Sequence, residues 1–121
     1  MGDCRAAAGR AAEGRVLGLL RQRGWSLLER NWRCRWGELD LLLAKPHRLL
    51  LVEVKARRAA GPDLWGIRRL SQGQGKRLRR TFSCWLADHP DRALLPVEVV
   101  LALVQLGPPP GAVRWLRLED L

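Results

Sequence analysis

The sequence predicts a mixed α/β domain: a sheet of about five strands flanked by helices, in the order α-β-β-β-α-β-β. Two segments carry apolar residues at helical spacing, and five shorter segments are apolar or alternate between apolar and polar residues. Glycine and proline clusters separate these segments. Neither a repeat nor a long linker divides the 121 residues, so a single domain spanning residues 1–121 is expected.

The first helix is expected over residues 4–23. Apolar residues recur there at every fourth position and form one face of a helix: Ala12, Val16 and Leu20. Gly24 follows as a natural C-terminal stop. Residues 25–33, with the sequence WSLLERNWR, are then expected to form the first strand.

Two further strands are expected at residues 37–44 and 49–56, joined by a turn at residues 45–48 that contains Pro46. A second helix is expected over residues 74–88, where His89-Pro90 ends it. The last two strands are expected at residues 97–104 and 112–118, with a loop rich in proline and glycine between them. Alternating helices and strands of this kind are typical of one mixed sheet.

The net charge is strongly positive, at +10, because 22 Lys and Arg stand against 12 Asp and Glu. Such an excess in a small domain favours a polyanionic partner, either nucleic acid or an anionic membrane surface. A basic proteome or a solubility adaptation is the alternative. No apolar run is long enough to span a membrane, and no signal peptide is expected. The three cysteines have no CxxC spacing, which favours reduced packing residues of a cytoplasmic protein.

The central hairpin carries the acidic residues of most interest. Alternation along a strand places Glu38 and Asp40 on one face, with Leu39 and Leu41 on the other. Hairpin counting pairs residues whose numbers sum to about 93. Asp40 is then expected opposite Glu53, and Glu38 opposite Lys55.

Two opposed carboxylates repel each other unless something compensates for their charge. Mg²⁺ or Mn²⁺ bound by Asp40 and Glu53 would compensate, because both ions prefer hard oxygen ligands. Lys55, two residues beyond Glu53, would then hold a water or neutralise a phosphate, as phosphodiester hydrolysis requires. The alternative is a solvated strand face with ordinary surface ion pairs.

Glu13 is a third candidate metal ligand, on the first helix. It is the only carboxylate in that helix and lies beside the apolar face, so its side chain could lean over the sheet. The alternative is a surface ion pair with Arg5 or Arg10 along the same helix.

These motifs resemble those of the YraN-like family of small bacterial proteins. The motifs stand in the same order and spacing: Gly9-x-x-x-Glu13, Gly24-Trp25, Asn31-Trp32-Arg33, Gly37-Glu38-Leu39-Asp40-Leu41 and Val52-Glu53-Val54-Lys55-x-Arg57. The resemblance covers nearly the whole chain and implies a restriction-endonuclease-like fold, related to the archaeal Holliday junction resolvases. It implies a nuclease site of Asp40, Glu53 and Lys55, with Glu13 as the helix acid of the resolvases. A homodimer is implied by analogy alone.

Charge and resemblance together favour a metal-dependent endonuclease-like protein of the PD-(D/E)xK type that acts on DNA, including branched DNA. Basic residues beside the hairpin and along the second helix are expected to bind the nucleic acid: Arg33, Arg57, Arg58, Lys76, Arg77 and Arg80. A solvated helix face is the alternative for the helical ones. Two functions from other classes also remain open, a non-catalytic nucleic-acid-binding module of the same fold and a protein-interaction adaptor.

Five of the six tryptophans divide into two expected groups. Trp32 and Trp36 lie near the entry to the hairpin and are candidates for stacking on nucleobases. Trp25, Trp85 and Trp115 are expected to pack in the core, as most tryptophans do.

Overall fold

A computed structural model of the chain describes residues 4–57, 74–107 and 109–118. The elements follow in the order α1 (Cys4–Gln22), β1 (Ser26–Cys34), β2 (Gly37–Lys45), β3 (Arg48–Arg57), α3 (Gln74–Ala87), η2 (Pro90–Arg92), β4 (Val97–Gln105) and β5 (Val113–Arg117). This confirms the predicted order of helices and strands, and the predicted bounds of each differ by one residue at most. The short 3₁₀ helix η2 was not predicted; it begins at the proline that follows α3.

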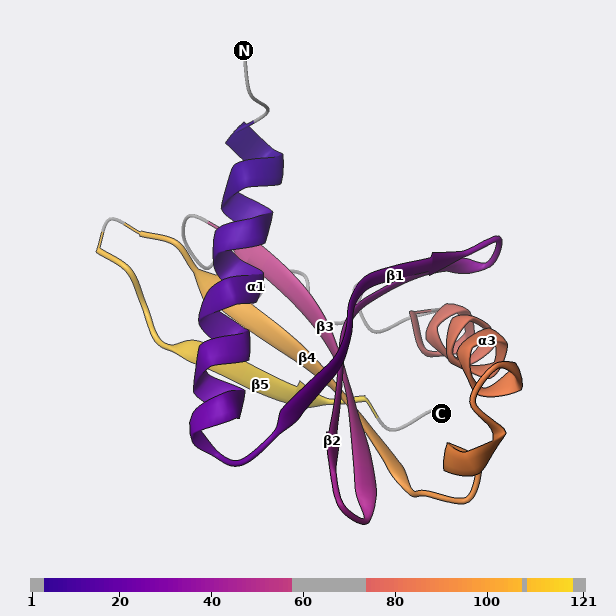
Figure 1. Cartoon of the computed structure of the whole chain (residues 1–121). Helices are drawn as coiled ribbons and strands as arrows, with labels where there is room; N and C mark the ends of the chain where they lie inside the picture. The colour runs from indigo at the N-terminus through magenta and orange to yellow at the C-terminus, as the bar shows by residue number, and fades with distance from the viewer. Residues whose placement is uncertain (1–3, 58–73, 108, 119–121) are drawn as a thin grey trace.

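The five strands form one sheet in the order β1-β2-β3-β4-β5. Neighbouring strands are antiparallel except β3 and β4, which are parallel. Parallel neighbours need a crossover connection, and α3 lies on the chain between them. Helix α1 covers one face of the sheet and α3 lies on the opposite side (Figure 1). No helix in the described ranges is long and apolar enough to cross a membrane.

The two helices α1 and α3 pack against opposite faces of the sheet, and each forms a hydrophobic core with the face that it covers. On the α1 side, the predicted helix face packs on alternate side chains of the two central strands: Leu41, Leu43, Leu50 and Val52. On the α3 side, the intervening side chains of the same strands meet the second helix: Leu42, Leu49, Leu51, Leu78, Phe82 and Trp85. The central strands are therefore buried on both faces, which is why they read as nearly continuous runs of leucine and valine.

The tryptophan predictions were correct in part. Trp25 and Trp85 are buried as expected. Trp115 is not in the core but 40% exposed, because β5 is a short edge strand with a single neighbour. Trp32 is half-buried and packs against the α3-side core. Trp36 is exposed.

Replacement of Leu43 by alanine is expected to destabilise the fold by about 3 kcal/mol, because it removes buried methyl groups and leaves a cavity. Leu43 is fully buried in the α1-side core. Leu94 is 97% exposed, so Leu94→Ala serves as the matched control and should change stability by less than about 0.5 kcal/mol. Urea unfolding followed by far-UV circular dichroism measures both variants. Equal effects of the two substitutions would contradict the assignment of the core.

Candidate active site

The hairpin register predicted by counting is correct, but the ladder between its strands stops early. Pairing runs from Lys45 with Arg48 to Leu41 with Val52, and every pair sums to 93. The backbone N–H of Val54 then donates to Oδ2 of Asp40, at 2.8 Å. A carboxylate thus takes a strand N–H at the point where β2 and β3 separate, and the β1–β2 hairpin bends away from β3 there (Figure 1).

The predicted alternation around Asp40 is wrong. Leu39 and Leu41 were expected on one face, but Leu39 packs in the α3-side core and Leu41 in the α1-side core. The side chains of β2 therefore change faces at Asp40. The neighbouring strand is irregular at the same level, because Asn31 adopts a left-handed conformation with φ of 55°. Asn31 lies between the residues that pair with Leu41 and Leu39, across from Asp40.

A pocket of about 330 Å³ opens where the strands separate. All three predicted carboxylates and the predicted lysine line it, together with an arginine of α3: Glu13, Asp40, Glu53, Lys55 and Arg77. These residues come from α1, β2, β3 and α3, so the pocket lies where both helices approach the open end of the sheet. The pairing across the hairpin is what brings the two strand carboxylates together.

Asp40 and Glu53 lie close enough for the charge of one to act on the other. Burial, and then repulsion by Glu53, raises the pKa of Asp40 from its ordinary 3.8 to about 7, although the hydrogen bond from the Val54 N–H lowers it. Burial also raises the pKa of Glu53, and the nearby ammonium of Lys55 opposes this rise. A proton or a cation bound between the two carboxylates would reduce the repulsion between them.

Glu53 is fixed by two donors. It is 7% exposed, and its Oε1 accepts a hydrogen bond from Nε2 of Gln74 at 3.0 Å. Nζ of Lys55 lies 3.5 Å from the same oxygen. Lys55 was expected opposite Glu38, but Glu38 instead pairs with Arg33, at 3.5 Å between Oε2 and Nε. The reason is the early end of the ladder, beyond which Glu38 and Lys55 belong to diverging strands.

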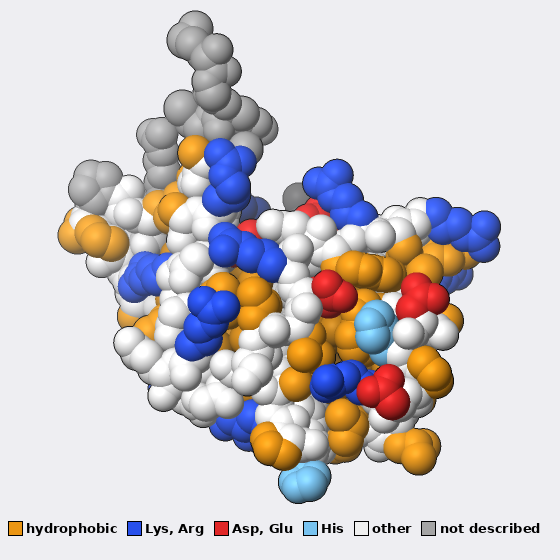
Figure 2. Space-filling view, viewed as in Figure 1, with side chains coloured by type: hydrophobic (Ala, Val, Ile, Leu, Met, Phe, Trp, Pro, Cys, Tyr) orange, Lys and Arg blue, Asp and Glu red, His pale blue; other side chains and the backbone are white. Residues whose placement is uncertain are grey.

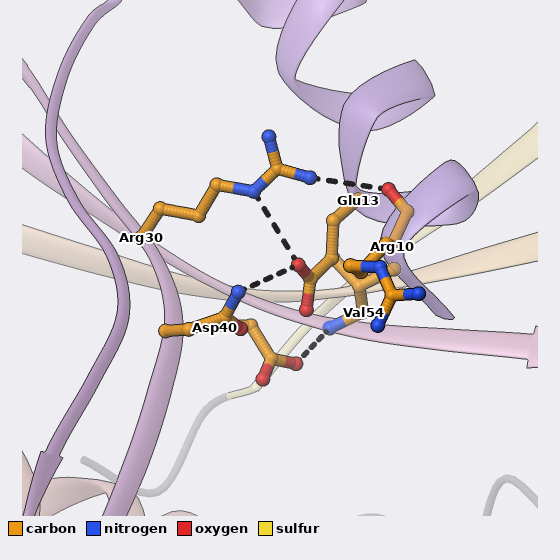
Figure 3. Close-up of polar contacts among 6 residues, drawn as sticks. Arg10, Glu13, Arg30, Asp40 and Val54 are labelled. Atoms are coloured by element: carbon orange, nitrogen blue, oxygen red, sulfur yellow. Dashed lines mark hydrogen bonds and ion pairs between the residues drawn. The ribbon is translucent and has the colours of Figure 1, made fainter. Parts of the chain in front are cut away.

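The side chain of Glu13 extends over the sheet, as predicted from its position at the edge of the apolar face of α1. Its Oε1 accepts a hydrogen bond from Nδ2 of Asn31 at 3.1 Å and lies 3.5 Å from Nε of Arg30. In Figure 3 the side chains of Glu13, Arg30 and Asp40 approach one another from α1, β1 and β2. The ion pair expected as the alternative, with Arg10 on the same helix, is not the one formed. Arg10 offers only its backbone carbonyl, to Arg30.

The donor set suits a hard divalent cation. Asp40 and Glu53 offer carboxylate oxygens, which Mg²⁺ and Mn²⁺ prefer, and burial raises the pKa values of both. Glu13 reaches the same pocket with one oxygen already engaged. Within the part of the chain that the structure describes, no three acidic, histidine or cysteine side chains form a preassembled metal centre. The residues fit a cation held by Asp40 and Glu53, with Glu13 beside them.

Of the predicted nucleic-acid-binding residues that the structure describes, one lines the pocket and the others are exposed on α3, β1 and β3. Arg77 lines it, and Lys76 and Arg80 are exposed on the same helix. Arg33 is exposed on β1, and Arg57 at the end of β3. Arg58 lies outside the described residues. Figure 2 shows Lys and Arg side chains along the α1 side and at the end to which the β1–β2 turn extends.

Sequence reasoning missed the role of three residues at this site. Gln74 is the first residue of α3 and is buried against Glu53, and nothing in its local pattern distinguishes it from a surface glutamine. Arg30 and Asn31 hold Glu13. The signal for Asn31 was its place in the Asn-Trp-Arg motif, because asparagine is one of the few residues that tolerate a left-handed conformation.

Fold and pocket together define a class: a small mixed α/β protein with a carboxylate and lysine pocket where two central strands separate. Over residues 12–102 the chain matches the profile described as "Uncharacterised protein family UPF0102". A UPF0102 protein of Prochlorococcus marinus (strain MIT 9303) is 53% identical over 109 residues, covering 90% of this chain and 86% of the relative. One of Parasynechococcus marenigrum (strain WH8102) is 49% identical over 113 residues, covering 93% and 82%. The chain belongs to the UPF0102, or YraN-like, family.

Proposed function

We propose that this protein is a divalent-metal-dependent endonuclease that hydrolyses phosphodiester bonds in DNA, branched DNA included, in the cytoplasm. The observation that carries the proposal is the juxtaposition of the half-buried Asp40 and the buried Glu53, two carboxylates with raised pKa values, beside Lys55 in one pocket. A purely structural pair of this kind would destabilise the fold. Mg²⁺ or Mn²⁺ bound between the two carboxylates would offset their repulsion, and a metal site would account for their placement together.

Each residue of the pocket has a distinct part in this proposal. A bound divalent cation would polarise the phosphoryl group and lower the pKa of a bound water. Lys55 donates hydrogen bonds from Nζ, which orients the attacking water and neutralises charge that develops on the phosphate. The Val54 N–H fixes Asp40, and Gln74 fixes Glu53, so that both carboxylates are positioned before substrate arrives. Glu13 is the proposed third carboxylate of the site.

The surroundings of the pocket favour a nucleic acid over a small phosphate ester. The net charge is +10, and Arg77 places a guanidinium on the pocket wall. The exposed arginines and lysine beyond it can follow a phosphate backbone: Arg33, Arg57, Lys76 and Arg80. Binding through such contacts weakens steeply as salt concentration rises.

A cleavage panel tests the proposal. The purified chain is incubated with duplex, flap, four-way junction and single-stranded DNA, and with RNA duplex, in Mg²⁺, Mn²⁺ or EDTA. Cleavage of at least one DNA is expected with either metal and none with EDTA. Lys55→Ala should reduce the cleavage rate by about 10²-fold or more, the order seen when a group that stabilises transition-state charge is removed. Lys45→Ala, at the other end of β2, is the matched control and should cleave like the wild type.

The same panel separates the proposal from its alternatives. A non-catalytic nucleic-acid-binding module would bind DNA in a salt-dependent manner, cleave nothing, and keep its affinity without Asp40 and Glu53. A protein-interaction adaptor would bind no nucleic acid at moderate salt. Cleavage of RNA alone would contradict the proposed substrate, and unchanged cleavage by Lys55→Ala would contradict the proposed role of the lysine.

A further inference from the structure

Trp36 presents an aromatic ring to solvent beside the pocket. It is 44% exposed, in the turn between β1 and β2. Two guanidinium groups lie against its ring, with Cζ of Arg35 4.6 Å and Cζ of Arg80 5.4 Å from the ring centroid. An exposed indole flanked by positive charge has the two features that bind single-stranded nucleic acid: a stacking surface and electrostatic attraction for phosphate.

The ring is held next to the candidate active site by the packing of its turn on α3. Gly37 follows Trp36 with φ of 147°, and a Cβ there would lie 3.0 Å from Oγ1 of Thr81. Glycine thus permits the turn to approach the helix closely. Gly37 and Arg77 both line the pocket, and Arg80 lies three residues after Arg77, on the same side of α3. One continuous surface therefore runs from Asp40 and Glu53 to the indole.

An exposed indole cannot stack on the bases of intact duplex DNA, because these bases are stacked inside the helix and only phosphates and groove edges face outward. An unpaired base offers its whole face. Contacts between guanidinium and indole at exposed positions are weaker than stacking of a base on an aromatic ring. A base can therefore displace one guanidinium from the ring, and that arginine remains close enough to bind the adjoining phosphate.

We propose that Trp36, with Arg35 and Arg80, binds an unpaired nucleobase of a DNA strand whose duplex portion lies over the pocket. This inference rests on the proposed function, because it takes DNA as the ligand of the pocket. It assigns the protein a preference for duplex DNA with a single-stranded extension over fully paired DNA. It also gives the exposed ring a function distinct from the hydrolysis that the carboxylates would perform.

The test measures binding without cleavage. Fluorescence anisotropy in EDTA gives the Kd of wild type, Trp36→Ala and Trp36→Phe for a blunt duplex and for the same duplex with a single-stranded tail of roughly ten nucleotides. Trp36→Ala should weaken binding of the tailed duplex about 10-fold, from the loss of one stacked base, and leave the blunt duplex within about twofold. Trp36→Phe should restore most of the affinity. Trp115→Ala, which removes another exposed tryptophan, at 40% exposure, should change neither.

Three results would overturn the inference: equal weakening of both DNAs by Trp36→Ala, no weakening of either, or no binding of any DNA by the wild type. Failure of hydrolysis is a separate outcome. A chain that prefers the tailed duplex through Trp36 and cleaves nothing would contradict the nuclease proposal alone, whereas active cleavage with no effect of Trp36 would contradict this inference alone.

Discussion

Replacement of Asp40 by asparagine is expected to reduce metal-dependent cleavage by at least about 10²- to 10³-fold, the order seen when one group that stabilises transition-state charge is lost. Asparagine keeps the shape of the side chain, and its amide oxygen can still accept the Val54 N–H that Oδ2 accepts now. The local backbone should therefore be unchanged. What the variant loses is the negative charge that would hold a divalent cation together with Glu53. Single-turnover cleavage at saturating Mg²⁺ measures the effect.

The chain offers a matched control for this variant. Asp91 lies in η2, with a side chain 76% exposed, and its ion-pair partner Arg92 is its neighbour in the sequence. Asp91→Asn makes the same chemical change outside the pocket and should cleave at the wild-type rate. Glu53→Gln should behave like Asp40→Asn, because it removes the other half of the carboxylate pair. Full activity in both pocket variants would show that the hydrolysis, if present, takes place elsewhere.

The fold was predictable because the signals that define it are local. The register between β2 and β3 follows from the turn at residues 45–48, since a hairpin of fixed length pairs fixed positions. That register brings Asp40 near Glu53, so the centre of the site could be predicted with no knowledge of the rest of the molecule. The stripe of Ala12, Val16 and Leu20 likewise predicts which side of α1 meets the sheet.

The rest of the site depends on contacts between distant segments, which periodicity does not encode. Gln74 reaches Glu53 across 21 residues, and its place depends on how the connection after β3 returns α3 to the sheet. The change of face at Asp40 lies level with the left-handed Asn31 on the neighbouring strand, and strand periodicity predicts neither. Strict alternation therefore placed Leu39 on the wrong face, and hairpin counting continued past the end of the ladder placed Lys55 opposite Glu38.

Stability should rise, not fall, when Asp40 is replaced by asparagine, and the gain should depend on pH. The folded chain raises the pKa of Asp40 from 3.8 to about 7. A raised carboxylate pKa contributes stability that is complete below the unfolded value and is lost as pH rises through the folded value. The wild type should thus lose stability between about pH 4 and pH 8, and Glu53 acts in the same direction. The asparagine variant has no charge to lose at this position.

At about pH 8 without metal, Asp40→Asn should be more stable than the wild type by about 2 kcal/mol, roughly half of what linkage gives for a fully buried group, because the carboxylate is partly exposed. This corresponds to a rise in Tm of roughly 8 °C for a chain of this size. Thermal unfolding by circular dichroism measures it. Near pH 4 the two proteins should unfold at nearly the same temperature, because the wild-type carboxylate is then neutral when folded.

Addition of Mg²⁺ or Mn²⁺ at about pH 8 should reverse this order. A ligand that binds the folded state alone stabilises it by an amount that grows with its concentration relative to Kd. The wild type should gain stability with either metal, because the cation relieves the repulsion between Asp40 and Glu53. Asp40→Asn has lost one of the two charges, and its Tm should barely move. Two results would contradict the interpretation of Asp40 and Glu53 as a cation site formed by two repelling carboxylates. One is a wild-type Tm that neither metal changes. The other is an asparagine variant that is less stable than the wild type at pH 8 without metal.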